Sequence, residues 1–193
     1  MEAEESGLVP VFAAFDNEEV GSSTKQGAGS TFLYDVLRRI CGECSEEDFR
    51  RYLASSFLLS CDNAHAVHPN HPEYADGQNR PYMNRGVVMK FNAAQHYTTD
   101  SVSEAFIKLL ASDHDIPLQF FANRSDIAGG STLGGIATTK VSINSADIGL
   151  AQLAMHSTYE TAGIKDTAYL IDLCKAFFTT PFIVEGDGIY RIG

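Results

Sequence analysis

The sequence predicts an α/β protein, with a three-layer α/β/α sandwich around a mixed, mostly parallel central sheet. Short, nearly continuous apolar runs recur along the chain, as in strands that are buried on both faces of a sheet. Segments with the helical spacing of apolar residues separate these runs, and this alternation is typical of largely parallel sheets. The 193 residues are enough for one well-filled core, so we expect one domain.

The first half of the chain contains two expected strands and two expected helices. Val9–Phe15 and Phe57–Cys61 are apolar runs that predict interior strands. Between them, Gly27–Ile40 has helical spacing. Ser45 is followed by three acidic residues, as an N-cap and the first turn of a helix would be, so a second helix is expected from there to about Ala54.

Three further strands and three further helices are expected in the second half. A capping-box pattern at Ser101–Glu104 predicts the start of a helix whose inner side carries Ala105, Phe106, Leu109 and Leu110. Residues 63–85 form a long polar loop, and loops of this length are usually functional or disordered. The other expected elements are strands at Gly86–Phe91, Leu118–Ala122 and Ser145–Ile148, a helix from the glycine-rich turn Gly129–Gly135 to about Val141, and a helix at Asp166–Phe178.

The composition argues against two classes of partner. Fourteen basic against 25 acidic residues give a net charge of -11, whereas nucleic acids and anionic membranes reward clustered Lys and Arg. The acidic start is neither a signal peptide nor a basic presequence, and no apolar run approaches the ~20 residues of a membrane helix. The four cysteines, including a lone Cys41-x-x-Cys44, are expected to be reduced, partly buried thiols in a cytoplasmic protein.

Two adjacent carboxylates, Glu18 and Glu19, follow the first expected strand and precede a turn rich in glycine and serine. Neighbouring carboxylates repel each other, and shielding from water costs each its hydration. Such a pair is stable at low cost when a cation neutralises one member or when one holds a proton. The pair therefore indicates a metal ligand beside a general base, with a solvated acidic turn as the alternative.

Two more candidate ligands stand at strand ends, where sheet proteins place their active sites. Asp62 ends the second expected strand, and His156 follows the segment Ser145–Ile148. Carboxylates and imidazoles are the ligand set of hydrolytic zinc. The structural alternatives are that Asp62 caps a turn and that His156 caps a helix starting near Ser157.

The polar loop holds three histidines, His65, His68 and His71, at a spacing that fits no standard zinc site. We expect at most one of them to touch the reaction and the others to hold loop geometry through hydrogen bonds. The glycine-rich turn could cradle an anion at the start of the next helix, or it could be a tight turn that needs positive φ. No phosphate-loop, nucleophile-elbow or H-E-x-x-H pattern occurs in the sequence.

Several short motifs follow one another along nearly the whole chain, and together they resemble the aspartyl aminopeptidases. They are Asp16-Asn17-Glu18-Glu19-Val20-Gly21-Ser22, Asp62-x-Ala64-His65-Ala66-Val67-His68-Pro69-Asn70, Gly86-x-Val88-x-Lys90, Arg124-Ser125-Asp126, Ser131-Thr132-Leu133-Gly134 and Met155-His156-Ser157. The resemblance implies a cytoplasmic dizinc exopeptidase of the α/β/α metallopeptidase fold. It covers the C-terminal half of the family's chain, so residues 1–193 are expected to be the C-terminal portion of the catalytic domain.

The resemblance also assigns roles in a zinc-dependent aminopeptidase that removes N-terminal Asp or Glu from peptides with a metal-activated water. Glu18 would be the general base. Glu19 and His156 would share the first of two zinc ions, and Asp62 would bind the second. A base at this place would take the proton of the attacking water and pass it to the leaving amine.

Three further residues match family positions around the N-terminal side chain of the peptide substrate: His65, Lys90 and Tyr97. A cation and two donors there would suit a carboxylate. The family's bridging aspartate, one zinc-binding histidine and an inserted oligomerisation domain lie upstream of the Asp16 motif, and the 15 residues before Asp16 contain none of them. The full-length form is expected to be a homo-oligomer.

Two alternatives stay open beside this assignment. The first is a truncated, catalytically incomplete relative that acts as a scaffold or peptide-binding module, because a dizinc centre without its bridge holds metal weakly. The second is an aminopeptidase that prefers neutral N-terminal residues.

Overall fold

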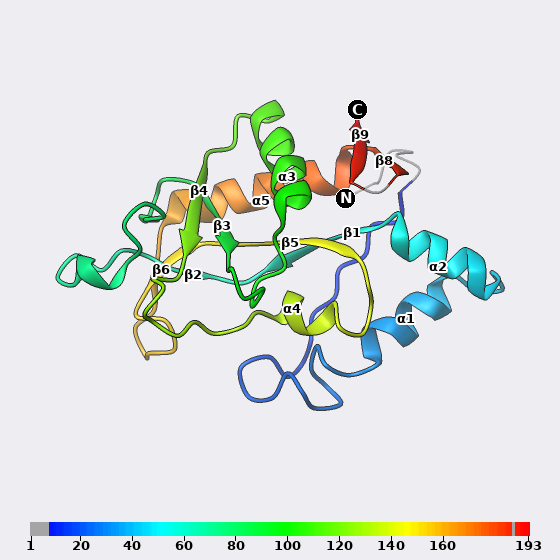
Figure 1. Cartoon of the computed structure of the whole chain (residues 1–193), viewed down its shortest axis with the longest axis horizontal. Coiled ribbons are helices and arrows are strands. Elements are labelled where there is room, and N and C mark those ends of the chain that lie inside the picture. Colours follow the sequence, from blue (N-terminus) through cyan, green and yellow to red (C-terminus); the bar gives the residue numbers. More distant parts are fainter. Residues whose placement is uncertain (1–7, 187) are drawn as a thin grey trace.

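The computed structural model of the chain describes residues 8–186 and 188–193, which form a mixed α/β fold (Figure 1). The main sheet has four strands in the order β1-β5-β3-β4. Strand β1 runs parallel to β5 and β3 runs parallel to β4, whereas β3 and β5 are antiparallel. The expected mixed, mostly parallel sheet is therefore confirmed. The strands are β1 (Phe57–Cys61), β5 (Asn144–Gly149), β3 (Val87–Phe91) and β4 (Leu118–Ala122).

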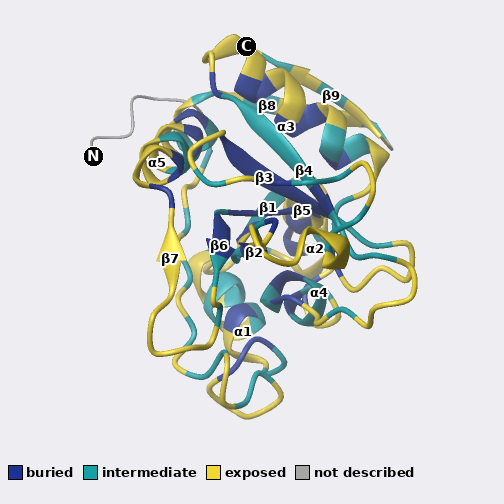
Figure 2. Ribbon diagram, turned by 90° about the vertical axis from the view of Figure 1, so that its left-hand side faces the viewer, coloured by how far each residue is buried: buried dark blue, intermediate teal, exposed yellow. Residues whose placement is uncertain are grey.

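Helices cover both faces of this sheet (Figure 1). On one face, Val87 and Met89 of β3 pack against α3 (Ser101–Asp113) and α5 (Ile164–Thr179) in the main core. The side chains of a strand alternate between faces, so Val88 lies in a separate cluster on the other side. Figure 2 shows the buried residues concentrated in the central strands β3 and β5.

The opposite face carries α4 (Leu133–Ala137), which joins α1 (Phe32–Ile40) and α2 (Glu46–Ala54) in a second core. The expected helix that follows the glycine-rich turn is thus only five residues long, and turns lead on from it to Val141. Helix α4 packs closely against the sheet. A side chain at Gly134 of this helix would overlap the Ser60 hydroxyl of β1.

A second, smaller sheet extends the parallel pair β1 and β5 beyond their carboxyl ends. It contains β2 (Ala64–His65), β6 (Ala151–Leu153) and β7 (Thr161–Ala162). The backbone N–H of Asp62 donates to Ile148 across the junction, so the chain stays extended where the candidate ligand stands. The remaining elements are the short 3₁₀ helix η1 (Pro72–Tyr74) and the hairpin of β8 (Phe182–Gly186) and β9 (Ile189–Ile192).

The prediction of a strand at Val9–Phe15 is wrong. Residues 9–15 join none of the sheets in the described part of the chain, and the side chains of Val9 and Phe12 are exposed. An apolar run forms an interior strand only where neighbouring strands take up its backbone hydrogen bonds. This segment has no such neighbour, although Ala13 and Phe15 pack on the core around α1.

Two helices begin at other residues than expected. The first starts at Phe32 rather than Gly27, because residues 16–31 are folded into turns and a side chain at Gly27 would overlap the backbone of Ser22. In α3 the N-cap is Asp100, whose carboxylate accepts from the N–H groups of Val102 and Ser103. The capping box is therefore one residue earlier than the sequence pattern indicated. On the same helix, Ile107 faces the core, while Ala105 and Leu109 are exposed.

The cysteine prediction holds for only half of the four residues. Cys41 and Cys44 form a disulfide, contrary to the expectation of reduced thiols, because the turn after α1 brings their Cα atoms to 5.7 Å. Cys61 and Cys174 are free. Among the described residues, no helix is both long and apolar enough to cross a bilayer.

Candidate metal centre

Glu18 and Glu19 lie on a loop whose turns are held by backbone hydrogen bonds, such as that from Gly21 N–H to the Glu18 carbonyl. The Ser22 hydroxyl donates to the same carbonyl at 2.9 Å. Desolvation raises the pKa of Glu18 above its ordinary value, and the negative charges of Glu19 and Asp62 add to this effect, while His156 opposes it. These four candidate residues are therefore electrostatic neighbours, as a shared centre requires. A carboxylate with a raised pKa is suited to general base catalysis near neutral pH.

Glu19 and His156 come together from segments that are far apart in the chain. The Nε2 atom of His156 lies 3.3 Å from Oε1 of Glu19, and both side chains are exposed. Two ligands of one tetrahedral zinc, each bound at about 2.0–2.1 Å, stand about 3.3–3.4 Å apart. The two donor atoms therefore already have the separation that a common ion needs.

His156 is held in a strained turn after β6. Its φ is +66°, and Ala154 in the same turn has φ +55°. Residues other than glycine rarely adopt a positive φ, and the exceptions cluster at functional sites. The backbone N–H of His156 donates to the Glu160 carboxylate at 2.6 Å, which fixes the turn. No helix begins at Ser157, so the helix-cap alternative for His156 is wrong. No sequence motif indicated Glu160, although it lies only four residues after His156.

Lys90 holds Asp62 in place through an ion pair and hydrogen bonds. The ammonium Nζ of Lys90 lies 3.2 Å from Asp62 Oδ2 and donates to the carbonyls of Asp62 and Asn63 at 3.3 and 3.0 Å. Lys90 is almost fully buried, whereas the side chain of Asp62 is partly exposed. One face of the Asp62 carboxylate is thus paired with a fixed cation.

The other two residues expected around the substrate lie near Lys90. The Lys90 ammonium sits 4.8 Å from the centre of the Tyr97 ring, and the Tyr97 hydroxyl donates to Asn123 at 3.1 Å. Desolvation raises the pKa of Tyr97, so its hydroxyl stays a donor at neutral pH. Desolvation lowers the pKa of His65, and the interactions with Lys90 and His156 add to this effect while Asp62 opposes it, so the neutral imidazole is favoured.

No sequence motif predicted the buried polar cluster that adjoins these residues. Asp147 of β5 is fully buried, and its carboxylate accepts from the Ser60 hydroxyl at 2.5 Å and from the N–H and hydroxyl of Thr98 at 2.6 and 2.9 Å. Since Thr98 follows Tyr97, the cluster fixes the loop that carries Tyr97. A charged residue inside an expected interior strand was the available signal.

The other histidines and the glycine-rich turn have structural roles. The ring of His68 accepts from the Asn70 N–H at 3.2 Å, and His71 pairs with Glu73 at 3.0 Å, as expected for residues that hold loop geometry. In the turn, a side chain at Gly129 would overlap Asn123. Close packing, not positive φ, explains the glycine there.

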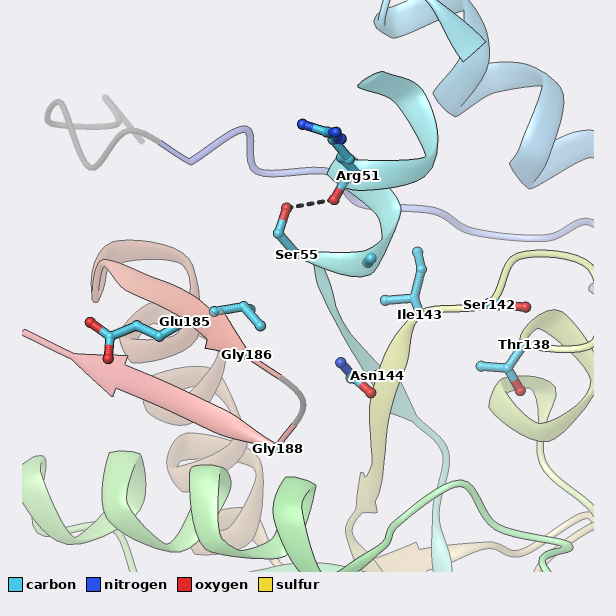
Figure 3. A pocket seen from close by; sticks show the side chains of 11 residues that line it. Arg51, Ser55, Thr138, Ser142, Ile143, Asn144, Glu185, Gly186 and Gly188 are labelled. Carbon is cyan, nitrogen blue, oxygen red and sulfur yellow. Dashed lines mark hydrogen bonds between the residues drawn. The ribbon is translucent and has the colours of Figure 1, made fainter. Parts of the chain in front are cut away.

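One surface pocket lies away from these residues. Its volume is about 740 Å³, and it is bounded by the end of α2, the start of β5 and the β8–β9 hairpin, as Arg51, Asn144 and Glu185 show in Figure 3. It lies at the amino ends of β1 and β5, opposite the edge that carries Asp62. A smaller pocket of about 500 Å³ adjoins the histidine-rich loop, with Arg80 and Arg85 in its wall. We place the chemistry at the carboxyl ends of the strands, because the perturbed titratable groups lie there.

The donor types at the candidate site fit zinc. Among residues 8–186 and 188–193, no three His, Cys, Asp or Glu side chains stand together as a metal-binding group. Glu19 and His156 provide one pair of donors, and Asp62 is a near neighbour that is still paired with Lys90. Carboxylate and imidazole donors at the ends of strands in a mixed α/β fold are features of metal-dependent hydrolases.

The chain belongs to the M18 aminopeptidase family. The family described as "Aminopeptidase I zinc metalloprotease (M18)" matches residues 1–178. The chain is 51% identical over 170 residues to the "Probable M18 family aminopeptidase 2" of Clostridium novyi, covering 87% of this chain and 39% of that protein. It is 43% identical over 176 residues to the "Probable aspartyl aminopeptidase" of Ricinus communis, covering 90% and 36%. The resemblance inferred from the motifs is therefore confirmed.

Solved structures agree with this assignment. A chain of the cryo-EM structure of the Ape4 and Nbr1 complex matches with a TM-score of 0.82 and 42% identity, covering 86% of this chain and 32% of that one. The S. cerevisiae mApe1 dodecamer matches with a TM-score of 0.75 and 31% identity, covering 85% and 36%. The chain spans about 39% of the length of the first curated relative.

Proposed function

We propose that this protein provides the C-terminal part of the catalytic domain of a zinc-dependent aminopeptidase that removes N-terminal Asp or Glu from peptides. Family membership supports the aminopeptidase activity, and the 3.3 Å approach of Glu19 to His156 beside Glu18 is the observation that carries the site. In this proposal the described residues are part of a three-layer α/β/α metallopeptidase fold. The assembly is a homo-oligomer, by analogy with the mApe1 dodecamer. The proposed location is the cytoplasm, as the motif resemblance implies.

Each candidate residue has a role that its chemistry supports. Glu19 and His156 would hold one zinc ion and Asp62 a second. Zinc supplies a Lewis acid that polarises a carbonyl and acidifies water. Glu18 takes the proton of the attacking water and gives it to the leaving amine. His65, Lys90 and Tyr97 bind the acidic side chain of the substrate.

The test is release of aspartate from a peptide with N-terminal Asp by the full-length protein, supplied with zinc. We expect Glu18→Gln to lower kcat by roughly 10²–10⁴-fold, because the base is lost while the ligands remain. Glu43→Gln, a change of the same kind on the exposed turn after α1, should leave the rate unchanged. Undiminished activity of the Glu18→Gln protein would refute the mechanism.

A second candidate function is a peptide-binding module without catalysis. It is favoured by one observation, the lack of a three-ligand group among the described residues. Zinc content distinguishes the two functions. About two tightly held zinc ions per chain contradict the binding module, and a peptide that binds equally well with and without a chelator supports it.

A further inference from the structure

The Cys41–Cys44 disulfide lies in the connection between α1 and α2, and the metal centre makes no use of it. The Cα atoms are 5.7 Å apart, a usual separation for a disulfide. Between them Gly42 adopts φ +65°, and nothing lies within 4 Å of where its side chain would be. The bond therefore closes the turn between α1 and α2, which lie together at one end of the molecule (Figure 1). Both cysteines are partly exposed.

Arg38 is fixed against this turn and lies beside one of the two sulfurs. Its Nη1 atom is 3.8 Å from Cys44 Sγ and donates to the Gly42 carbonyl at 3.0 Å, while Nη2 donates to the Cys44 carbonyl at 3.1 Å. The guanidinium also stacks over the Phe49 ring at 5.5 Å. Glu46 shares this cation, with 3.8 Å between its Oε2 and the Arg38 Nε. These contacts therefore fix the positive charge of Arg38 next to the sulfur of Cys44.

The two sulfurs differ in their helical surroundings as well. Cys41 is the C-cap of α1, where the partial negative charge of the helix end disfavours a thiolate. Cys44 precedes the N-cap Ser45 of α2, where the partial positive charge favours one. Both effects make Cys44 the better leaving group and Cys41 the better target of an attacking thiolate.

We propose that Cys41–Cys44 is a redox-active disulfide that exchanges with low-molecular-weight thiols of the glutathione class. The thiolate of one reagent molecule attacks Cys41 Sγ, the S–S bond breaks, and its electron pair leaves with Cys44. A second reagent thiolate attacks the reagent sulfur of the mixed disulfide and releases Cys41. The two reagent thiols lose two electrons and two protons and form one disulfide. The protein gains those electrons and protons as two thiols.

Reduction leaves the turn in place, so the exchange is reversible. The Arg38 hydrogen bonds to the carbonyls of Gly42 and Cys44 do not involve the S–S bond. Both cysteine side chains also pack on the apolar cluster around Leu33 and Phe49. The same contacts hold the two sulfurs near each other after reduction and favour reclosure.

The experiment follows the reaction of the oxidised protein with reduced glutathione, with acid quenching, alkylation and peptide mass spectrometry. We expect a transient glutathione adduct on Cys41 and full conversion to two thiols, reversed by oxidised glutathione. Two results would overturn the proposal. One is a glutathione adduct that forms only on Cys44. The other is a failure of the disulfide to re-form when the reduced protein is incubated with oxidised glutathione.

Variants test the part played by Arg38. Arg38→Met should slow the exchange several-fold, because the leaving thiolate loses its neighbouring charge. Arg38→Lys keeps the charge and should restore most of the rate. This variant distinguishes loss of the charge from a disturbed fold in Arg38→Met. Arg39→Met removes an exposed cation from the same helical turn and should have no effect. Equal rates in the Arg38→Met and wild-type proteins would remove Arg38 from the mechanism.

Discussion

Lys90 and Asp62 form a pair in which the lysine is buried and the aspartate reaches the surface. The exposed fractions of their side chains are 3% and 29%, and Nζ of Lys90 lies 3.2 Å from Oδ2 of Asp62. The other two Lys90 hydrogen bonds go to the carbonyls of Asp62 and Asn63. An ammonium has three donors. All three N–H donors of Lys90 therefore bind the turn between β1 and β2. Lys90 can bind a substrate carboxylate only if one of these hydrogen bonds breaks.

The first prediction concerns the free energy of unfolding of Lys90→Met. Loss of the ammonium leaves two carbonyls and a carboxylate without their donor, so we expect destabilisation by about 2 kcal/mol. Lys175→Met removes an exposed lysine that pairs with Asp172, and it should change the stability by less than about 0.5 kcal/mol. Urea denaturation measures both. Equal losses in the two variants would mean that Lys90 does not hold the turn.

The second prediction uses the close approach of β5 to the same turn. A side chain at Gly149 would overlap the carbonyl oxygen of Asp62, which belongs to the backbone and cannot rotate away. Gly149→Ala should therefore destabilise the protein by about 3 kcal/mol. Gly77→Ala is the matched control, because nothing lies within 4 Å of its added Cβ and its φ is not positive. Thermal unfolding compares the two, and a Gly149→Ala protein as stable as the control would show that the turn can yield.

The third prediction concerns the buried carboxylate of Asp147. Asp147→Ala leaves two hydroxyls and one backbone N–H without an acceptor, so we expect a loss of about 3 kcal/mol in the free energy of unfolding. Asp147→Asn keeps one carbonyl oxygen that can accept from Thr98, and it should lose less. Guanidinium denaturation of both variants measures the difference. If Asn were as damaging as Ala, a single accepting oxygen would not be enough to hold Thr98.

Local patterns were sufficient for much of the secondary structure. Strands β1 and β4 have the expected bounds, because a short run of buried apolar residues between polar segments has few other uses. Ser45 caps α2 as its sequence indicated. Val9–Phe15 has the same apolar character as β1 and forms no strand, since pairing depends on a neighbour that the segment itself does not specify.

Motifs and strand ends indicated candidate residues for the site, but not which side chains pair with them. Glu18, Glu19, Asp62 and His156 were chosen from motifs and strand ends, and they lie near one another. That Asp62 pairs with Lys90, 28 residues away, follows from the order of the strands. The strained turn at His156 and its Glu160 partner also depend on tertiary structure. No propensity of a short segment specifies such contacts.

The fourth prediction concerns Cys61 and Cys174, which lie in contact between β1 and α5. The hydrogen bond from Cys61 lowers the pKa of Cys174 to about 7, although desolvation opposes this. The thiolate is the reactive form, so alkylation of Cys174 by iodoacetamide should accelerate as the pH rises to about 7 and level off above it. Cys61→Ala removes the donor and should shift the midpoint toward 8.5, the ordinary thiol value. Because the pKa of Cys61 is raised, Cys61 stays protonated and unreactive in this range, so peptide mass spectrometry can follow Cys174 alone. An unchanged midpoint in Cys61→Ala would mean that the Cys61 hydrogen bond does not stabilise the Cys174 thiolate.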